Sequence, residues 1–189
     1  MSLIAGILLA AGESRRFGGR KLLHALPDSG AIGERSAAAL AAAVDRAVAV
    51  LAPDDAALAE LMRSVGLEIC YCPSAREGMG ASLACGVRAA ADADGWVVAL
   101  ADMPYVSSAT VAAVADALRA GAALAAPVHA GRRGHPVGFA RAYYRDLIGL
   151  SGDEGARRIL QRDATRVLLL PVDDPGIHRD IDTPDDISP

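Results

Sequence analysis

Aromatic residues are scarce in this chain: they make up 4% of the 189 residues, whereas hydrophobic residues of all kinds make up 52%. The core must therefore be built mainly from alanine, leucine and valine, whose small volumes suit helices packed closely against a sheet. The length is enough for one well-buried domain and too short for two of ordinary size. We therefore expect a single domain over residues 1–189.

Cysteine is rare as well, and Cys70, Cys72 and Cys85 show no repeat typical of metal ligands. Their odd number and spacing support neither a disulfide framework nor a zinc site. The first residues also lack the basic segment of a signal peptide, and the apolar run over residues 3–9 is too short to span a bilayer. These absences predict a cytoplasmic protein without a membrane partner, in a reducing compartment.

The chain has no excess of positive charge, since its net charge is −4 and its isoelectric point is near 5.5. Binding to nucleic acid normally requires a basic surface, so we expect no nucleic-acid partner. A local cluster of basic residues is informative against this acidic background. One short segment contains such a cluster, made of Arg15, Arg16, Arg20 and Lys21.

This basic segment follows the apolar run over residues 3–9, which is typical of a strand buried on both faces of a parallel sheet. Between them lie Ala10, Ala11 and Gly12, which let a ligand approach the backbone and whose N–H groups could cradle an anion. Arginine binds phosphate oxygens as a planar fork and lysine as a point charge, so the segment suits a triphosphate. An ordinary strand end beside a solvated basic surface is the alternative, because neither GxGxxG nor GxxxxGK[ST] is present.

Apolar runs and alanine-rich segments alternate along the rest of the chain. The alternation predicts an α/β fold with a doubly wound, mostly parallel sheet, and Pro136 indicates a short antiparallel element at the edge of that sheet. Strands are expected over residues 3–9, 48–51, 67–72, 96–101, 122–128, 136–139, 167–172 and 177–182. Helices are expected over residues 33–45, 55–64, 81–91, 108–119, 141–149 and 153–162.

Asp102 ends an otherwise uncharged strand, so it is either a turn residue or a carboxylate that requires water or a cation. Mg²⁺ suits this position because it binds a few hard oxygen ligands and completes its shell with water and phosphate, and Mn²⁺ is the alternative ion. Asp180 and Asp182 are spaced so that both carboxylates point the same way on a strand, and they could complete the same site. Thr183 and Pro184 also fit the first turn of a helix, and both interpretations can hold together.

Two further segments contain residues suited to binding. Gly78 and Ser82 belong to a small, flexible loop before a helix, which suits recognition of a nucleobase but also an ordinary helix start. Arg132, Arg133 and His135 lie in one predicted turn, which suits either an anionic ligand or a solvated hairpin tip.

The N-terminal loop resembles the signature loop of nucleotidyltransferases that join an NTP to a phosphorylated acceptor, with the pattern Leu9-Ala10-Ala11-Gly12-x-Ser14-x-Arg16-Phe17-Gly18-x-x-Lys21. It is most similar to that of molybdenum cofactor cytidylyltransferases and their MobA-like relatives. Further resemblance to this family lies in Ala101-Asp102-Met103-Pro104, Asp180-Ile181-Asp182-Thr183-Pro184, Gly134-His135-Pro136-Val137 and Gly152-Asp153-x-Gly155-Ala156-Arg157. The resemblance implies a Rossmann-like nucleotidyltransferase fold.

The same resemblance implies transfer of CMP from CTP to a molybdopterin-type acceptor, with release of pyrophosphate. It assigns catalysis to Arg16, Lys21 and Asp102, and the metal to Asp102 together with Asp180 and Asp182. The nucleotide-binding residues would be Leu9, Ala10, Ala11, Gly12, Ser14, Arg16, Lys21, Gly78 and Ser82. The acceptor-binding residues would be Arg132, Arg133, His135 and Arg157.

The implied macromolecular partner is a transient one, either a molybdoenzyme or a chaperone that inserts the cofactor. The same scaffold could instead use GTP, as MobA-type guanylyltransferases do, or another acceptor. Ala11 favours CTP, because the guanylyl relatives usually carry a second glycine at that place. A nucleotide-binding protein without turnover, such as a cofactor chaperone, is the alternative from another functional class.

Overall fold

The apolar run at the N-terminus forms the strand β1 (Ile4–Leu9) in the computed structural model, which describes residues 2–12, 17–27, 30–153 and 155–187. β1 pairs in parallel with β2 (Arg46–Leu51) on one side and with β4 (Gly95–Leu100) on the other. β3 (Glu68–Tyr71) continues the parallel sheet beyond β2. The predicted α/β fold with a mostly parallel sheet is therefore confirmed.

The antiparallel strand that follows Pro136 lies inside the sheet, so the expectation that it forms an edge is wrong, although a second, two-residue antiparallel strand does end the strand order. The sheet runs in the order β3-β2-β1-β4-β7-β5-β6, with β8 also paired to β5. After β5 (Leu124–His129) the chain reverses and returns as β7 (Val137–Ala140), which fills the space between β4 and β5. β5 also pairs with two other strands. They are β6 (Arg132–Arg133), which is antiparallel to β5, and β8 (Val167–Pro171), which is parallel to it.

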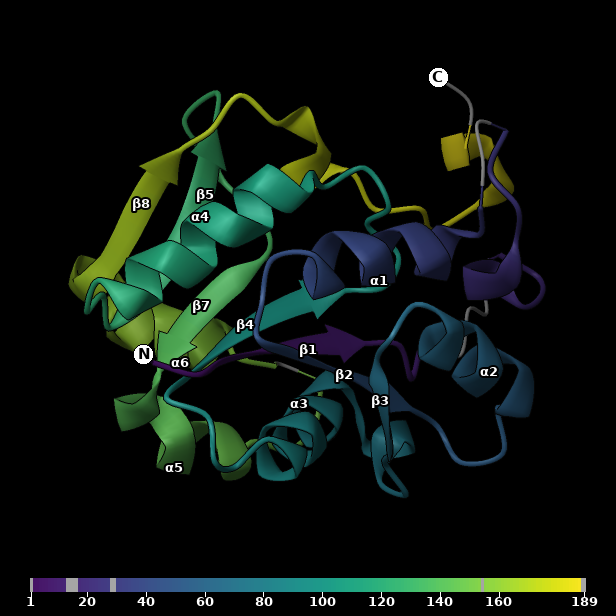
Figure 1. Ribbon diagram of the computed structural model, residues 1–189, viewed down its shortest axis with the longest axis horizontal. Helices are drawn as coiled ribbons and strands as arrows, with labels where there is room; N and C mark the ends of the chain where they lie inside the picture. The colour runs from purple at the N-terminus through teal and green to yellow at the C-terminus, as the bar shows by residue number, and fades with distance from the viewer. Residues whose placement is uncertain (1, 13–16, 28–29, 154, 188–189) are drawn as a thin grey trace.

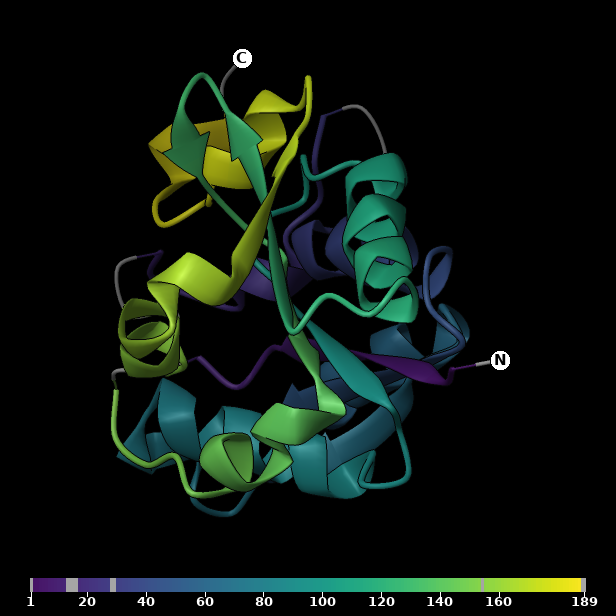
Figure 2. The same ribbon diagram turned by 90° about the vertical axis from the view of Figure 1, so that its left-hand side faces the viewer.

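Helices cover both faces of the sheet (Figures 1 and 2). One face carries α1 (Ile32–Ala41), α2 (Ala56–Ser64) and α4 (Ser108–Arg119). The other carries α3 (Met79–Ala89), α5 (Tyr144–Ile148) and α6 (Arg157–Arg162). Within the described ranges, no helix combines the length and apolar character that crossing a membrane requires. Short 3-10 turns span Lys21–Leu23, Ala75–Glu77, Arg141–Tyr143, Ala164–Arg166, Pro175–His178 and Pro184–Ile187.

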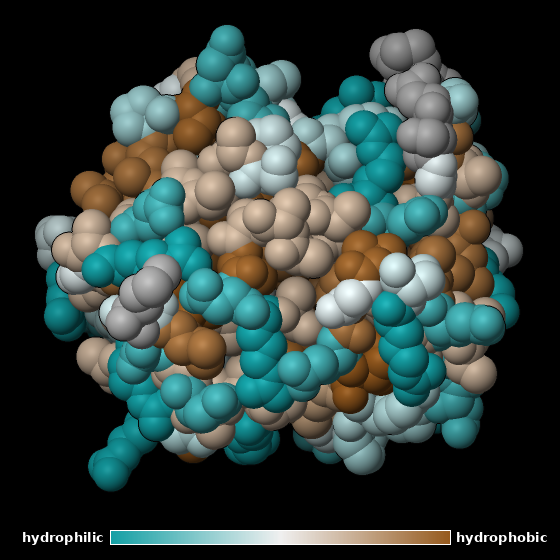
Figure 3. Space-filling view, in the orientation of Figure 1, coloured by the Kyte–Doolittle hydropathy of each residue, from teal (hydrophilic) through white to brown (hydrophobic). Residues whose placement is uncertain are grey.

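Strand alternation divides the core into two apolar layers, one on each face of the sheet. In β1, Ile4 and Leu8 pack with α1, α2 and α4, whereas Ala5 and Ile7 pack with α3 and α5. The outer strand β8 leaves Leu168 47% exposed and Leu169 50% exposed. The space-filling view accordingly shows hydrophobic surface over β8 (Figure 3).

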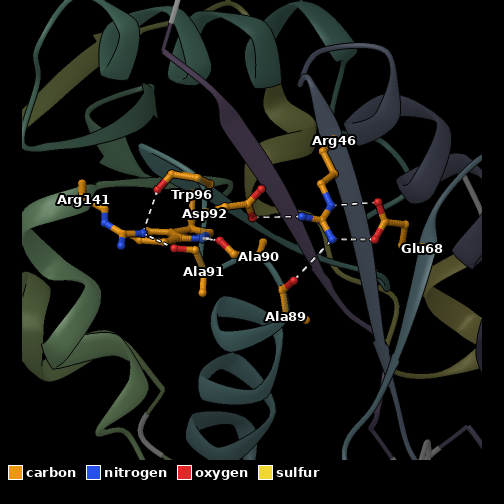
Figure 4. A network of polar contacts seen from close by, with 9 residues as sticks. Arg46, Glu68, Ala89, Ala90, Ala91, Asp92, Trp96 and Arg141 are labelled. Carbon is orange, nitrogen blue, oxygen red and sulfur yellow. Dashed lines mark hydrogen bonds and ion pairs between the residues drawn. The ribbon is translucent and has the colours of Figure 1, made fainter.

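Polar contacts hold the end of the sheet where β2 and β4 begin (Figure 4). Arg46 binds Glu68 through two hydrogen bonds of 2.7 and 2.6 Å and binds Asp92 at 3.0 Å. Arg141 donates to the carbonyls of Ala91 and Ala93, and its guanidinium lies 5.7 Å from the ring centre of Trp96. These contacts fasten the turn between α3 and β4 to the neighbouring strands.

The predicted strand over residues 177–182 is wrong. This segment begins with a 3-10 turn over Pro175–His178 and continues without regular structure. Ile177 and Ile181 are its buried apolar residues, and their spacing of four suits one face of a strand, so the sequence pattern alone could not exclude a strand here. The Ile181 N–H donates to the carbonyl of Asp102 at 2.9 Å, so the segment lies against the end of β4.

Asp174 ties the start of this C-terminal segment to α4. Its buried carboxylate accepts hydrogen bonds from the Ser107 N–H at 3.0 Å, the Thr110 hydroxyl at 2.6 Å and the Gly176 N–H at 3.0 Å. Burial alone would raise the pKa of Asp174, but these hydrogen bonds outweigh it and hold the pKa below its ordinary value.

We expect Asp174→Ala to lower the free energy of unfolding at pH 7 by about 3 kcal/mol, because buried donors lose a charged acceptor. A depressed pKa stabilises the fold above the unfolded-state value of about 3.9, and this contribution is lost as the pH falls through the folded-state pKa. The deficit of the variant should therefore shrink in acid. Urea denaturation at several pH values measures it.

Asp173→Ala is the matched control, because the neighbouring Asp173 side chain is fully exposed. It should change the free energy of unfolding by less than about 0.5 kcal/mol. Equal losses in the two variants would show that the Asp174 contacts do not stabilise the fold.

Candidate functional site

A cavity of about 660 Å³ opens at the carboxyl ends of β1 and β4. The two strands are parallel neighbours in which Leu9 lies opposite Leu100, so the segments that follow them meet at one edge of the sheet. Other segments complete the wall of the cavity. It is lined by Leu9, Ala10, Ala11, Gly12, Lys21, Leu22, Ala75, Arg76, Gly78, Met79, Ser82, Leu100, Ala101, Asp102, Asp153 and Asp182.

Lys21 is the buried cation of this cavity. Its Nζ lies 2.9 Å from Oδ2 of Asp102 and 3.5 Å from Oδ1 of Asp182, and its side chain is only 9% exposed. The two carboxylates are more open, with side-chain exposures of 28% and 44%. A buried ammonium requires such partners, because it has left the water that solvated its charge. The arrangement places one positive and two negative charges at the cavity wall.

Asp182 is held in place by Asp186. The Asp186 carboxylate accepts hydrogen bonds from the Thr183 N–H at 2.7 Å, the Thr183 hydroxyl at 2.9 Å and the Asp182 N–H at 3.0 Å. These contacts, of which the Thr183 N–H has the largest effect, hold the pKa of Asp186 below its ordinary value. Asp180 is exposed and does not line the cavity. The structure therefore brings Asp182, rather than Asp180, to Lys21 and Asp102.

The small residues after β1 leave the backbone open to the cavity. The Ala10 N–H already donates to the Val50 carbonyl at 3.0 Å, which extends the sheet by one residue. At Gly12 an added Cβ would meet no atom of the described residues within 4 Å, so these residues leave room for a ligand there. The predicted site residues Ser14 and Arg16 lie outside the described residues.

The loop before α3 contacts a second loop, which contains Gly152 and Asp153 and was not predicted to line the cavity. Ser82 is buried, and its hydroxyl donates to the Gly78 carbonyl at 3.4 Å. The Gly80 N–H donates to the Gly152 carbonyl at 2.7 Å. This contact brings Asp153 to the cavity wall. The paired glycines in Gly152-Asp153-x-Gly155 were the available signal, because both adopt the left-handed backbone conformation of a tight turn.

The four residues assigned to the acceptor do not line the cavity. Arg132 and Arg133 are exposed on β6, and Arg157 is exposed at the start of α6. His135 is half-buried, and its buried Nδ1 has no hydrogen-bond partner among the described residues. Burial lowers the pKa of His135, the nearby Arg133 lowers it further, and Asp102 and Asp180 oppose the shift, so the imidazole is neutral at pH 7.

Asp102 and Asp182 fit a divalent cation. Both are hard oxygen donors, they come from separate segments, and they converge on the same ammonium group. Among the described residues no group of three or more metal-binding side chains occurs. Mg²⁺ and Mn²⁺ can bind with only two protein carboxylates, because phosphate oxygens and waters complete their coordination when a nucleotide binds.

The chain is similar to known proteins over most of its length. The sequence profile of the MobA-like NTP transferase domain matches residues 6–167. The purine catabolism protein PucB of Bacillus subtilis is 35% identical over 202 residues, covering 97% of this chain and 93% of that protein. The crystal structure of Rv0371c from Mycobacterium tuberculosis matches with a TM-score of 0.84 and 30% identity, over 98% of this chain and 95% of that chain.

Two further solved structures have the same fold. Rv0371c in complex with manganese matches with a TM-score of 0.80 and 26% identity, over 98% of this chain and 96% of that chain. A nucleotidyl transferase from Methanothermobacter matches with a TM-score of 0.81 over 97% of this chain and 94% of that chain. Its identity is 22%, so this likeness concerns the fold alone.

We expect Asp182→Asn to weaken binding of Mn²⁺ to the nucleotide-free protein by about tenfold or more, because one of two converging carboxylates loses its charge. Asp180→Asn is the matched control and should change the affinity by less than about twofold, since Asp180 is exposed and does not line the cavity. Calorimetric titration with manganese chloride measures both. A larger loss for Asp180→Asn would contradict the assignment of Asp182.

Proposed function

The chain belongs to the MobA-like NTP transferase family, and we propose that this nucleotidyltransferase moves CMP from CTP to a phosphorylated molybdopterin-type acceptor. The observation that supports the reaction type best is the meeting of Lys21, Asp102 and Asp182 beside the open backbone at Gly12. Such a site has a cation for phosphate oxygens, carboxylates for a metal ion and room for a nucleotide.

The proposed reaction is an in-line displacement. An oxygen of the acceptor phosphate attacks the α-phosphorus of CTP, and pyrophosphate leaves with the electrons of the broken bond. The acceptor is already a phosphate monoester, which needs little deprotonation at neutral pH, so the protein mainly has to position it. Catalysis then depends on the charges that the protein places around the phosphates.

Lys21 would stabilise the negative charge that develops at the α-phosphate, because its ammonium lies at the cavity wall and is already oriented by Asp102. Arg16 would bind the phosphates of the leaving group. Asp102 and Asp182 would hold Mg²⁺ or Mn²⁺, which supplies positive charge to the phosphate oxygens when it is bound. The manganese complex of Rv0371c supports a divalent ion for this fold.

Cytosine would lie against Ala11, Gly78 and Ser82, which all line the cavity. Leu9, Ala10, Gly12 and Ser14 would complete the nucleotide site. GTP is the second candidate nucleotide, because the MobA-like family is defined by NTP transfer rather than by one base. A non-catalytic nucleotide-binding role is the third candidate, and pyrophosphate release separates it from the other two.

The acceptor would approach from the side of Arg132, Arg133, His135 and Arg157. The arginines would attract its phosphate, whereas His135, being neutral, would position it through a hydrogen bond. A molybdoenzyme or a chaperone that inserts the cofactor would then receive the product. The name of the Bacillus relative associates that protein with purine catabolism, and it specifies neither nucleotide nor acceptor.

Lys21→Ala and Asp102→Ala should each reduce pyrophosphate release by about 100-fold or more, because each removes a charge that acts on the phosphates or their metal. Arg63→Ala is the control for loss of a basic residue, since Arg63 is exposed at the end of α2. Melting temperatures of all variants report on the fold. Wild-type turnover in either site variant, with the acceptor present, would overturn the mechanism.

Binding of each nucleotide in the presence of Mg²⁺ should raise the melting temperature, and we expect CTP to raise it most among CTP, GTP, ATP and UTP. The reason is that a ligand stabilises the folded state by RT ln(1 + [L]/Kd), so at equal concentrations the nucleotide with the lowest Kd gives the largest shift. A thermal-shift panel at equal nucleotide concentrations measures this order. A larger shift with GTP than with CTP would replace the proposed base by guanine.

A further inference from the structure

Asp153 is a cavity carboxylate that the proposed reaction does not use. It lines the same cavity as Lys21 and Asp102, but it lies beside Gly78, at the loop where the proposed function places the nucleobase. The Asp153 side chain is exposed, and within the described ranges its carboxylate has no hydrogen-bond or ion-pair partner. An acceptor group is therefore available beside the loop that would contact the base.

The position of Asp153 is built into the packing of the two loops. A Cβ at Gly78 would clash with the Asp153 carboxylate and would lie 2.5 Å from the backbone carbon of Gly152. Gly78 has a φ of +124°, which side chains other than glycine rarely adopt. The hydrogen bond from Gly80 to Gly152 joins the same two loops at 2.7 Å. The start of α3 and the Asp153 loop thus form one wall of the cavity.

An ionised carboxylate can accept hydrogen bonds but cannot donate them. It attracts an amino group on a nucleobase and repels a carbonyl oxygen at the same place. Cytosine has an amino group at its 4-position, whereas uracil has a carbonyl oxygen there. Guanine also has an exocyclic amino group, next to a ring N–H, and a carboxylate can accept from both.

We propose that Asp153 determines base specificity by accepting a hydrogen bond from the exocyclic amino group of the nucleobase. This inference rests on the proposed function, because it requires a nucleotide in the cavity. It adds one requirement to the proposed function: the base must have an amino group on the side that faces residues 78 and 153. UTP is then rejected because its carbonyl oxygen would face a carboxylate.

The test compares nucleotide pairs that differ by one amino group, using the full chain and Mn²⁺. The wild-type protein should bind CTP at least about tenfold more tightly than UTP. Asp153→Asn should reduce this preference about tenfold, mainly because UTP binds better, since the new amide can donate to the carbonyl oxygen. GTP and ITP, which differ only in the 2-amino group, form the second pair for a protein that prefers guanine.

Asp173→Asn is the control for loss of a carboxylate, because Asp173 is fully exposed and does not line the cavity. It should leave both preferences unchanged, and melting curves confirm that each variant is folded. The wild type should discriminate within one of the two nucleotide pairs. If Asp153→Asn keeps that preference unchanged, the inference is overturned while the proposed function stays intact. A wild type that binds neither CTP nor GTP would overturn both, and one without preference within either pair would overturn the inference alone.

Discussion

The burial of the Lys21 ammonium is the constraint on which the rest of the site depends. A cation removed from water must have negative partners, and the fold supplies them from two distant segments. Asp102 comes from the end of β4, 81 positions away in the sequence, and Asp182 comes from the C-terminal segment. The same charges lie at the cavity wall, so the arrangement that stabilises the buried Lys21 ammonium also places it where the proposed function requires a phosphate.

The C-terminal segment is fastened at several points so that Asp182 reaches this place. Asp174 binds its beginning to α4, and the buried Ile181 binds its middle to the end of β4. Asp186 then holds the turn that carries Asp182. These contacts hold the segment at three separate places, so it keeps its position without pairing to a strand.

The part of the cavity beside α3 depends on close backbone packing rather than on charge. Gly78 and Gly80 allow the loop that contains Gly152 to approach within hydrogen-bond distance of α3. A side chain at either position would separate the two loops. Asp153 and Ser82 therefore share one cavity with Lys21 and Asp102, so the proposed contacts to base and phosphate belong to one site.

Local sequence patterns are enough to predict the alternating strands and helices, the small residues after β1 and the position of Asp102 at a strand end. Each of these follows from local hydrophobic patterns and small residues, which act within a few positions. Tertiary contacts place β7 inside the sheet, bring Asp182 rather than Asp180 to Lys21, enclose the Nδ1 of His135 and put Asp153 at the cavity wall. These outcomes depend on contacts between segments far apart in the chain, and the one local signal among them, the glycine pair around Asp153, indicates a tight turn but not the cavity that the turn lines.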